Sequence, residues 1–169
     1  MNELTDSVIE DAVAIGADCA RFKPLDIRNV DSRPDSSARY IYCSGIEAWN
    51  AAEFHRALCS AIRILKPAGI IRVAARDLDA VIYGYLLDRE RNQSTGMTRA
   101  QQLNAWRKNE KAEFVYNEED LASGLRKAGF VDIWRLTAGA SSIEIFRDCE
   151  RDGSPDLVLE ARKPASMND

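Results

Sequence analysis

The spacing of apolar and polar positions predicts helices and strands that alternate along the chain. Residues 5–16 are predicted to form a helix, because a cap-type threonine and early acids precede apolar positions that end at a glycine. A polar stretch rich in turn-forming residues follows at 31–37. Residues 38–45, with the sequence ARYIYCSG, then have the composition of a strand that runs into a glycine turn.

The next helix is predicted to begin at Asn50, because Glu53 three residues later completes the spacing of a capping box. Its apolar positions share one helical face. They are Phe54, Leu58, Ala61, Ile62 and Leu65. The helix must end before the Pro-Ala-Gly at 67–69, and the mostly apolar 70–75 is typical of a strand that is buried on both faces.

The remaining part of the chain continues the alternation. We expect helices at about 77–91, 98–108 and 117–128, and strands at 131–136 and 156–161. Short helices and strands in alternation indicate an α/β fold with a mainly parallel sheet. We expect a single domain over residues 1–164 and a loose tail at 165–169.

The amino-acid composition argues against nucleic-acid and membrane partners. The 169 residues carry 23 basic and 27 acidic side chains, a net charge of −4, and 46% of them are hydrophobic. This is typical of one globular domain, and the acidic excess argues against a nucleic-acid partner. The apolar runs are short and the first residues are acidic, so we expect no membrane span, no signal peptide and a cytoplasmic location.

Metal-site and nucleophile patterns are not found in the sequence. The four cysteines, Cys19, Cys43, Cys59 and Cys149, have no Cys-x-x-Cys spacing and no histidine at a ligand spacing, so we expect free thiols and no metal. His55 is the only histidine and lies off the apolar stripe of its helix. One solvated histidine supports neither a catalytic triad nor a Cys-His pair.

A recognisable motif lies at 63–73, where the chain has RILKPAGIIRV. This segment resembles the RVLKPGG-x-L-R-I segment of class I methyltransferases that depend on S-adenosylmethionine (SAM). Three further blocks follow in the family's order, at 77–79, 116–130 and 155–164, so the resemblance covers most of 26–164. It is to predicted methyltransferases often associated with bacterial surface-polysaccharide synthesis. It implies a Rossmann-like three-layer sandwich with about five mostly parallel strands and one antiparallel C-terminal strand.

The resemblance also shows which cofactor motif is lacking. In this family the first strand ends in a glycine-rich loop, where the backbone approaches the cofactor because glycine has no Cβ. The chain contains no G-x-G. If 5–16 corresponds to the helix after the family's second strand, the segment that carries this loop is missing. We therefore expect lost or impaired binding of SAM.

Five positions are candidate cofactor contacts by resemblance. Asp26, with Ile27 beside it, resembles the acid after the third strand that contacts the adenine; the alternative is a turn aspartate that caps local backbone groups. Cys43, Ser44 and Gly45 lie where the family's fourth strand opens toward the cofactor cleft.

Three further positions are candidate substrate contacts. Arg76 replaces a proline that is usual before the Asp-Leu pair, which places a cation at the C-terminal end of a strand beside Asp77. Tyr83 is a candidate for a substrate surface, although aromatics on helices usually serve packing, and a solvated arginine is the alternative for Arg76. Relatives commonly have SSHVLEH where this chain has CSGIEAW, so Gly45 and Trp49 stand in place of two histidines. Any acid/base role of those histidines is lost.

Two hypotheses follow from these observations. In the first, the chain is a degenerate methyltransferase, a pseudoenzyme with a scaffold role, and a homo-oligomer or a partner chain covers an exposed sheet edge. In the alternative, it is an active O-methyltransferase that acts on a hydroxyl of a glycan or small molecule and that a partner chain completes. Such an enzyme would hold donor and acceptor in line, with SAM as cofactor and no metal.

Overall fold

The computed structural model describes residues 11–16, 21–25, 32–87, 96–109, 111–150 and 156–165. Their strands form one sheet of six with the order β2-β1-β3-β4-β6-β5. The strands are β1 (Ala12–Ile15), β2 (Lys23–Leu25), β3 (Ala38–Ser44), β4 (Leu65–Ala75), β5 (Val131–Leu136) and β6 (Leu157–Arg162). Only β6 runs antiparallel to its neighbours among these strands. The predicted fold class is confirmed, with six described strands where about five were expected.

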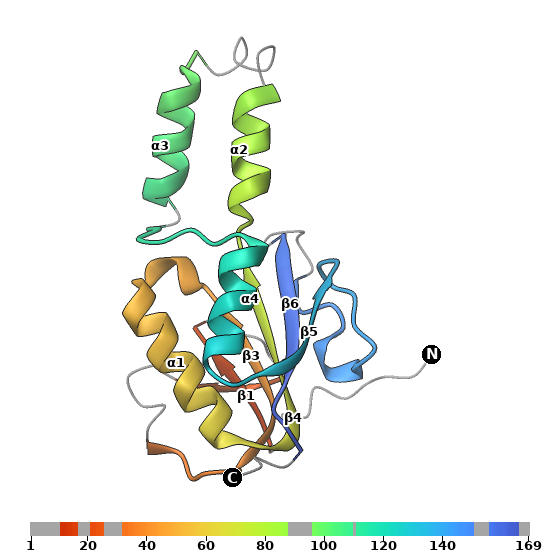
Figure 1. The fold of residues 1–169 in the computed structure, drawn as a ribbon. Coiled ribbons are helices and arrows are strands. Elements are labelled where there is room, and N and C mark those ends of the chain that lie inside the picture. The colour runs from red at the N-terminus through yellow and green to blue at the C-terminus, as the bar shows by residue number, and fades with distance from the viewer. Residues whose placement is uncertain are drawn as a thin grey trace.

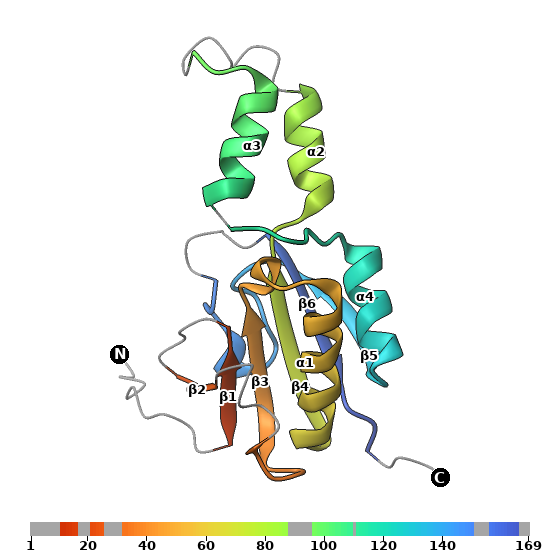
Figure 2. The ribbon, with the colours of Figure 1, turned by 90° about the vertical axis from the view of Figure 1, so that its left-hand side faces the viewer.

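Helices cover one face of the sheet, and an irregular segment covers the other. The helices α1 (Ala51–Ile64) and α4 (Glu118–Lys127) lie side by side on the first face (Figures 1 and 2). On the second face, Phe22, Ile145 and Phe146 form a smaller apolar cluster with Tyr42 of β3. The short 3-10 helix η4 (Glu144–Phe146) supplies two of these residues.

A pair of helices extends beyond the sheet. The helices α2 (Leu78–Leu87) and α3 (Arg99–Asn109) stand next to each other above the end of β4 (Figures 1 and 2). The side chain of Asp77 caps α2, because its Oδ1 accepts the N–H of Asp79 at 3.0 Å. The expected continuation of this helix to residue 91 lies outside the described residues. Within the described ranges, no helix is long and apolar enough to cross a membrane.

The start of α1 follows the predicted capping box. Asn50 Oδ1 accepts the N–H groups of Ala52 and Glu53 at 3.0 Å, and Glu53 Oε2 accepts the N–H of Asn50 at 3.0 Å. Leu65, expected on the apolar face of this helix, instead begins β4. The predicted start of α4 is also confirmed, because the side chain of Asn117 accepts the N–H of residue 120.

The prediction of a helix at 5–16 is wrong for its described part. Residues 12–15 form β1, an interior strand that pairs in parallel with β2 on one side and β3 on the other. All four side chains are buried, so apolar residues are needed on both faces. A short apolar run cannot be assigned to helix or strand from periodicity alone, and pairing between strands decides it here. Residues 5–10 lie outside the described part of the chain.

A buried ionic network holds the segment that covers the second face. Arg72, on β4, has no exposed surface, and it donates to Glu150 Oε1 at 2.9 Å, Glu150 Oε2 at 2.5 Å and Glu160 Oε1 at 2.7 Å. It also donates to the carbonyl oxygen of Ala140 at 2.9 Å. Glu150 Oε2 accepts the N–H of Gly139 at 2.9 Å. One guanidinium therefore connects β4, β6 and the segment 139–150.

Candidate cofactor and substrate site

The C-terminal ends of the parallel strands meet at one edge of the sheet. β1 ends before Gly16, β3 ends at Ser44 and β4 ends at Ala75, directly below α2 and α3 (Figures 1 and 2). Ligands of open α/β sheets bind outside this edge, where the connections to the next elements diverge. We therefore take this edge as the candidate site.

Two glycines bring the ends of β1 and β3 against each other. Gly16 and Gly45 have φ angles of +89° and +68°, which favour glycine. A Cβ on Gly16 would lie 2.1 Å from the carbonyl oxygen of Ser44 and 3.2 Å from Cζ2 of Trp49. A Cβ on Gly45 would lie 3.4 Å from the carbonyl oxygen of Gly16. The chain itself therefore uses the space that glycine leaves at this point.

Glu47 connects three segments at this edge. It lies in the 3-10 helix η2 (Ile46–Ala48) and is 8% exposed. Its Oε1 accepts the N–H of Arg76 at 2.6 Å, and its carbonyl oxygen accepts the N–H groups of Glu113 at 2.7 Å and Phe114 at 3.2 Å. The sequence analysis missed this residue. The available signal was a single acid directly after a strand and a glycine turn, at the edge where ligands bind.

Asp77 is bonded within the chain through both carboxylate oxygens. It is 4% exposed, Oδ1 caps α2, and Oδ2 accepts Nη2 of Arg135 at 2.7 Å. Its N–H donates to Asp156 Oδ1 at 2.8 Å. Hydrogen bonds to Glu118 and then to Asp77 raise the pKa of Arg135, so the guanidinium stays charged. These bonds connect β4, β5 and the starts of α2 and α4.

Cys43 and Tyr116 lie in the core beneath the edge. The Cys43 side chain is 1% exposed, and burial, with the charge of Glu47, raises the pKa of its thiol to about 12. The Tyr116 hydroxyl is buried and has no hydrogen-bond partner among the described residues. Burial and then the charge of Glu47 also raise the pKa of Tyr116. Both groups are therefore held neutral at physiological pH.

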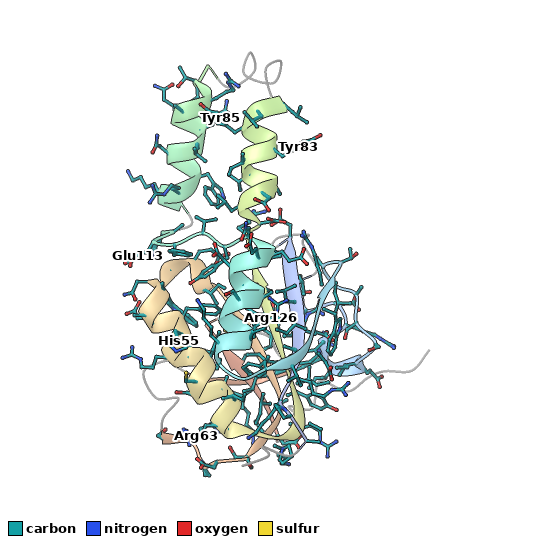
Figure 3. The ribbon with its side chains drawn as sticks, viewed as in Figure 1. His55, Arg63, Tyr83, Tyr85, Glu113 and Arg126 are labelled. Carbon is teal, nitrogen blue, oxygen red and sulfur yellow. The ribbon has the colours of Figure 1, made fainter. Side chains whose placement is uncertain are left out.

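The predicted site residues separate into three groups. Ser44, Gly45, Arg76 and Asp77 come together at the edge of the sheet. The Cys43 side chain faces the core, and Tyr83 is 65% exposed on α2. Figure 3 shows Tyr83 pointing away from α3. Asp26 and Ile27 lie outside the described residues.

The single histidine lies beside a cysteine of the same helix. His55 is exposed on α1 (Figure 3), and its Nε2 lies 3.6 Å from Sγ of Cys59. The described segments contain no group of three or more His, Cys, Asp or Glu side chains that could hold a metal ion.

An apolar cavity of about 350 Å³ lies beyond the end of β4, between α2, α3 and the segment 113–115. Its lining is mainly aliphatic and aromatic and includes two charged residues. The residues are Leu78, Val81, Ile82, Tyr85, Leu103, Arg107, Glu113, Phe114 and Val115. Sequence analysis could not find this cavity, because it depends on how two separate helices approach each other.

At the described part of this edge an indole packs beside Gly16, and the two buried carboxylates are bonded within the chain. The Trp49 ring and the carbonyl oxygen of Ser44 lie where a Cβ on Gly16 would point. The carboxylates of Glu47 and Asp77 already accept hydrogen bonds from the chain.

Comparison with known proteins finds similar structures but no similar family model or curated sequence. No family model and no curated protein matches the sequence. A SAM-dependent methyltransferase from Archaeoglobus fulgidus has 13% identity and a TM-score of 0.52, over 85% of this chain and 68% of that one. A SAM-dependent methyltransferase from Thermotoga maritima has 19% identity and a TM-score of 0.49, over 85% of this chain and 65% of that one.

The chain thus spans about two thirds of the length of these two structures. At such low sequence identity, the similarity is evidence for the fold alone. This evidence comes from the Archaeoglobus fulgidus structure, with its TM-score of 0.52. The chain has the fold of the SAM-dependent methyltransferases.

Proposed function

We propose that this chain is a methyltransferase-like protein in which SAM binding is lost or impaired, and that it acts as a scaffold or interaction subunit. The packing of Gly16 against Ser44 and Trp49 carries this proposal. A cofactor that approached Gly16 from the side of the Trp49 ring would have to displace this ring, which packs against the main apolar core. That displacement would expose apolar surface and so oppose binding.

The acid/base groups at the edge support the same function. Transfer of a methyl group to a hydroxyl oxygen is helped by a base that takes the proton, within hydrogen-bond reach of the acceptor. Among the described residues at this edge, Glu47 and Asp77 are the buried carboxylates, and each is bonded to backbone N–H or to Arg135. Both therefore serve to join elements of the fold.

In a scaffold role, the outer strands of the sheet could pair with another chain. β2 and β5 are the outer strands of the described sheet, and an outer strand offers backbone groups for pairing. A second copy or a partner chain that adds a strand beside β2 or β5 would cover the edge that this strand forms.

Ligand binding tests the proposal directly. The full chain is titrated with SAM and with S-adenosylhomocysteine by calorimetry and by thermal unfolding. A ligand with a Kd one hundredfold below its concentration stabilises by about 2.7 kcal/mol, roughly 5–11 °C for a domain of this size. We expect a shift below about 1 °C at millimolar ligand, which corresponds to a Kd near or above millimolar.

A matched pair of variants tests the stated cause. Trp49→Ala opens the space beside Gly16, whereas Trp134→Ala removes an indole from β5. If Trp49→Ala binds SAM weakly and Trp134→Ala does not, the result supports the explanation that the Trp49 ring blocks the cofactor. Stoichiometric binding by the wild-type chain overturns the proposal.

The alternative function is an O-methyltransferase acting on a glycan or small-molecule hydroxyl, of the kind linked to surface-polysaccharide synthesis. The cavity of about 350 Å³ beside β4 favours it, because small-ligand pockets begin near this size. The test is transfer of labelled methyl from SAM to a panel of sugars, with and without cell extract. Val81→Trp fills the cavity, so it should abolish any transfer, while Val131→Trp on β5 should retain it.

A further inference from the structure

An imidazole and a thiol lie together on the exposed side of α1. Nε2 of His55 is 3.6 Å from Sγ of Cys59, and both residues are exposed to solvent. Residues four apart face the same side of a helix, so the helix itself brings the two groups together. Cysteine is among the residues that proteins bury most often, so the exposed free thiol of Cys59 calls for an explanation.

The separation of the two groups matches that of two ligands on one zinc ion. Zinc binds imidazole nitrogen at about 2.0–2.1 Å and thiolate sulfur at about 2.3 Å, usually in tetrahedral geometry. Two such bonds at the tetrahedral angle place the nitrogen and the sulfur about 3.5 Å apart. The observed distance of 3.6 Å between Nε2 of His55 and Sγ of Cys59 is therefore the separation that a shared zinc ion requires.

The helix holds this pair on a firm support. The other side of α1 packs into the main apolar core through Phe54 and Leu58, and the capping box of Asn50 and Glu53 fixes its first turn. The backbone spacing of the two ligands is therefore set before any ion arrives. Ligands on a rigid element lose less freedom on binding than ligands on a loop.

Water can complete the coordination of such an ion. No third His, Cys, Asp or Glu side chain joins the pair to form a larger group within the described ranges, so the chain supplies two ligands. His55 also lines a hollow of about 320 Å³ between α1 and α4, which leaves room for water beside the imidazole. Asp120 and Lys127 line the same hollow, so neither sign of charge dominates there.

The donor atoms select the kind of ion. Imidazole nitrogen and thiolate sulfur suit Zn²⁺, whereas Mg²⁺ and Ca²⁺ prefer oxygen ligands. We propose that His55 and Cys59 form a two-ligand surface site for Zn²⁺ on α1. The imidazole binds through the lone pair of Nε2, and the thiol binds as the thiolate after it releases its proton to water. The inference does not depend on SAM binding.

Calorimetric titration of the full, tag-free chain with zinc chloride, in the presence of a phosphine reductant, tests the site. We expect one ion with a Kd of about 10–100 µM, because the chain supplies only two of the usual four ligands. Cys59→Ser should weaken binding at least about tenfold, whereas Cys59→His should retain it, because two histidines at this spacing also bind zinc. No saturable binding up to about 1 mM zinc, or binding by Cys59→Ser as tight as that of the wild type, overturns the proposal.

A variant with the same two groups at the wrong spacing is the matched control. His55→Ala with Ala52→His keeps one imidazole and one thiol at exposed positions of α1. Seven residues, about 10 Å along the helix, now separate them. This variant should lose zinc binding as fully as His55→Ala alone, and circular dichroism checks that both are folded. Binding at wild-type strength by either variant refutes the site.

Protection of the thiol from alkylation locates the ion. Saturating zinc should slow the labelling of Cys59 by iodoacetamide at least about tenfold, because a bound thiolate is no longer free to react. The half-buried Cys149 is the internal control, and its labelling should not change. In His55→Ala the protection of Cys59 should disappear. Protection that persists in His55→Ala, or none in the wild type, contradicts the shared ion.

Discussion

Replacement of Arg72 by methionine removes the cation from the buried network on the second face of the sheet. Four hydrogen bonds are lost, and the carboxylates of Glu150 and Glu160, neither with exposed side-chain surface, remain without their counter-charge. Removal of one partner from a buried ion pair costs about 3–5 kcal/mol. A domain has a total stability of about 5–15 kcal/mol, and each kcal/mol corresponds to about 2–4 °C at this size. We expect the melting temperature to fall by about 10 °C.

The stability lost on replacing Arg72 should be larger at neutral pH than at acidic pH. Burial alone would raise the pKa of Glu150, but the hydrogen bonds from Arg72 and Gly139 and the charge of Arg72 lower it. Its contribution in the wild type is therefore present above the unfolded pKa and is lost as the pH falls through the folded value. Without Arg72, burial should raise this pKa, so acidification should favour the folded variant. The difference between the two proteins should shrink from neutral pH toward about pH 4.

Urea unfolding followed by circular dichroism at several pH values measures both effects. Arg162→Met, on the neighbouring strand β6, is the matched control, because its ion pair with Asp132 spans 3.5 Å and both side chains are about half exposed. Such a pair contributes about 0–1 kcal/mol. A loss below about 1 kcal/mol for Arg72→Met, or a difference that does not vary with pH, would refute the reasoning.

Three further predictions concern single positions. Gly16→Ala should cost more than about 2 kcal/mol in urea unfolding because its Cβ meets a carbonyl oxygen, whereas Gly96→Ala, with open space around it, should cost only about 1–2 kcal/mol. Asn50→Ala removes the cap of α1 and should cost about 1 kcal/mol in thermal unfolding; an unchanged melting temperature contradicts this. Iodoacetamide followed by peptide mass spectrometry should label exposed Cys59 and spare Cys43, and equal labelling would show that the core opens.

Much of the fold follows from local signals in the sequence. Asn50 and Asn117 mark the starts of α1 and α4, because a cap uses a side chain and N–H groups only two or three residues apart. The strands β3, β5 and β6 are found from short β-branched, aromatic and aliphatic runs between turns. These features require no knowledge of distant contacts.

The missed features depend on contacts between distant segments. β1 has a helix-like order of residues and becomes a strand because β2 and β3 flank it. Arg72 and Glu160 are direct partners across β4 and β6, a pairing that the sequence alone does not reveal. One cation within an apolar strand and one anion within another were the available signals. The contact beside Gly16 likewise requires Trp49, which lies after β3 in the chain.

The candidate site was predicted only in part. The resemblance directed attention to Ser44, Gly45, Arg76 and Asp77, which do lie together at one edge. It did not reveal Glu47, whose carboxylate and carbonyl oxygen bind groups that are 29 or more residues away in sequence. The cavity between α2 and α3 was also not predicted, because it depends on how these two helices pack against each other.

The order of the strands affects how the chain folds during its synthesis. β6 lies between β4 and β5, and within the described sheet β5 pairs with β6 alone. While the ribosome still holds residues 157–162, β5 therefore has no strand to pair with and one side of β4 stays open. Pairings between distant segments form slowly, and uncovered strand edges invite association with other chains. The nascent protein should be most exposed to aggregation in the interval before β6 is released.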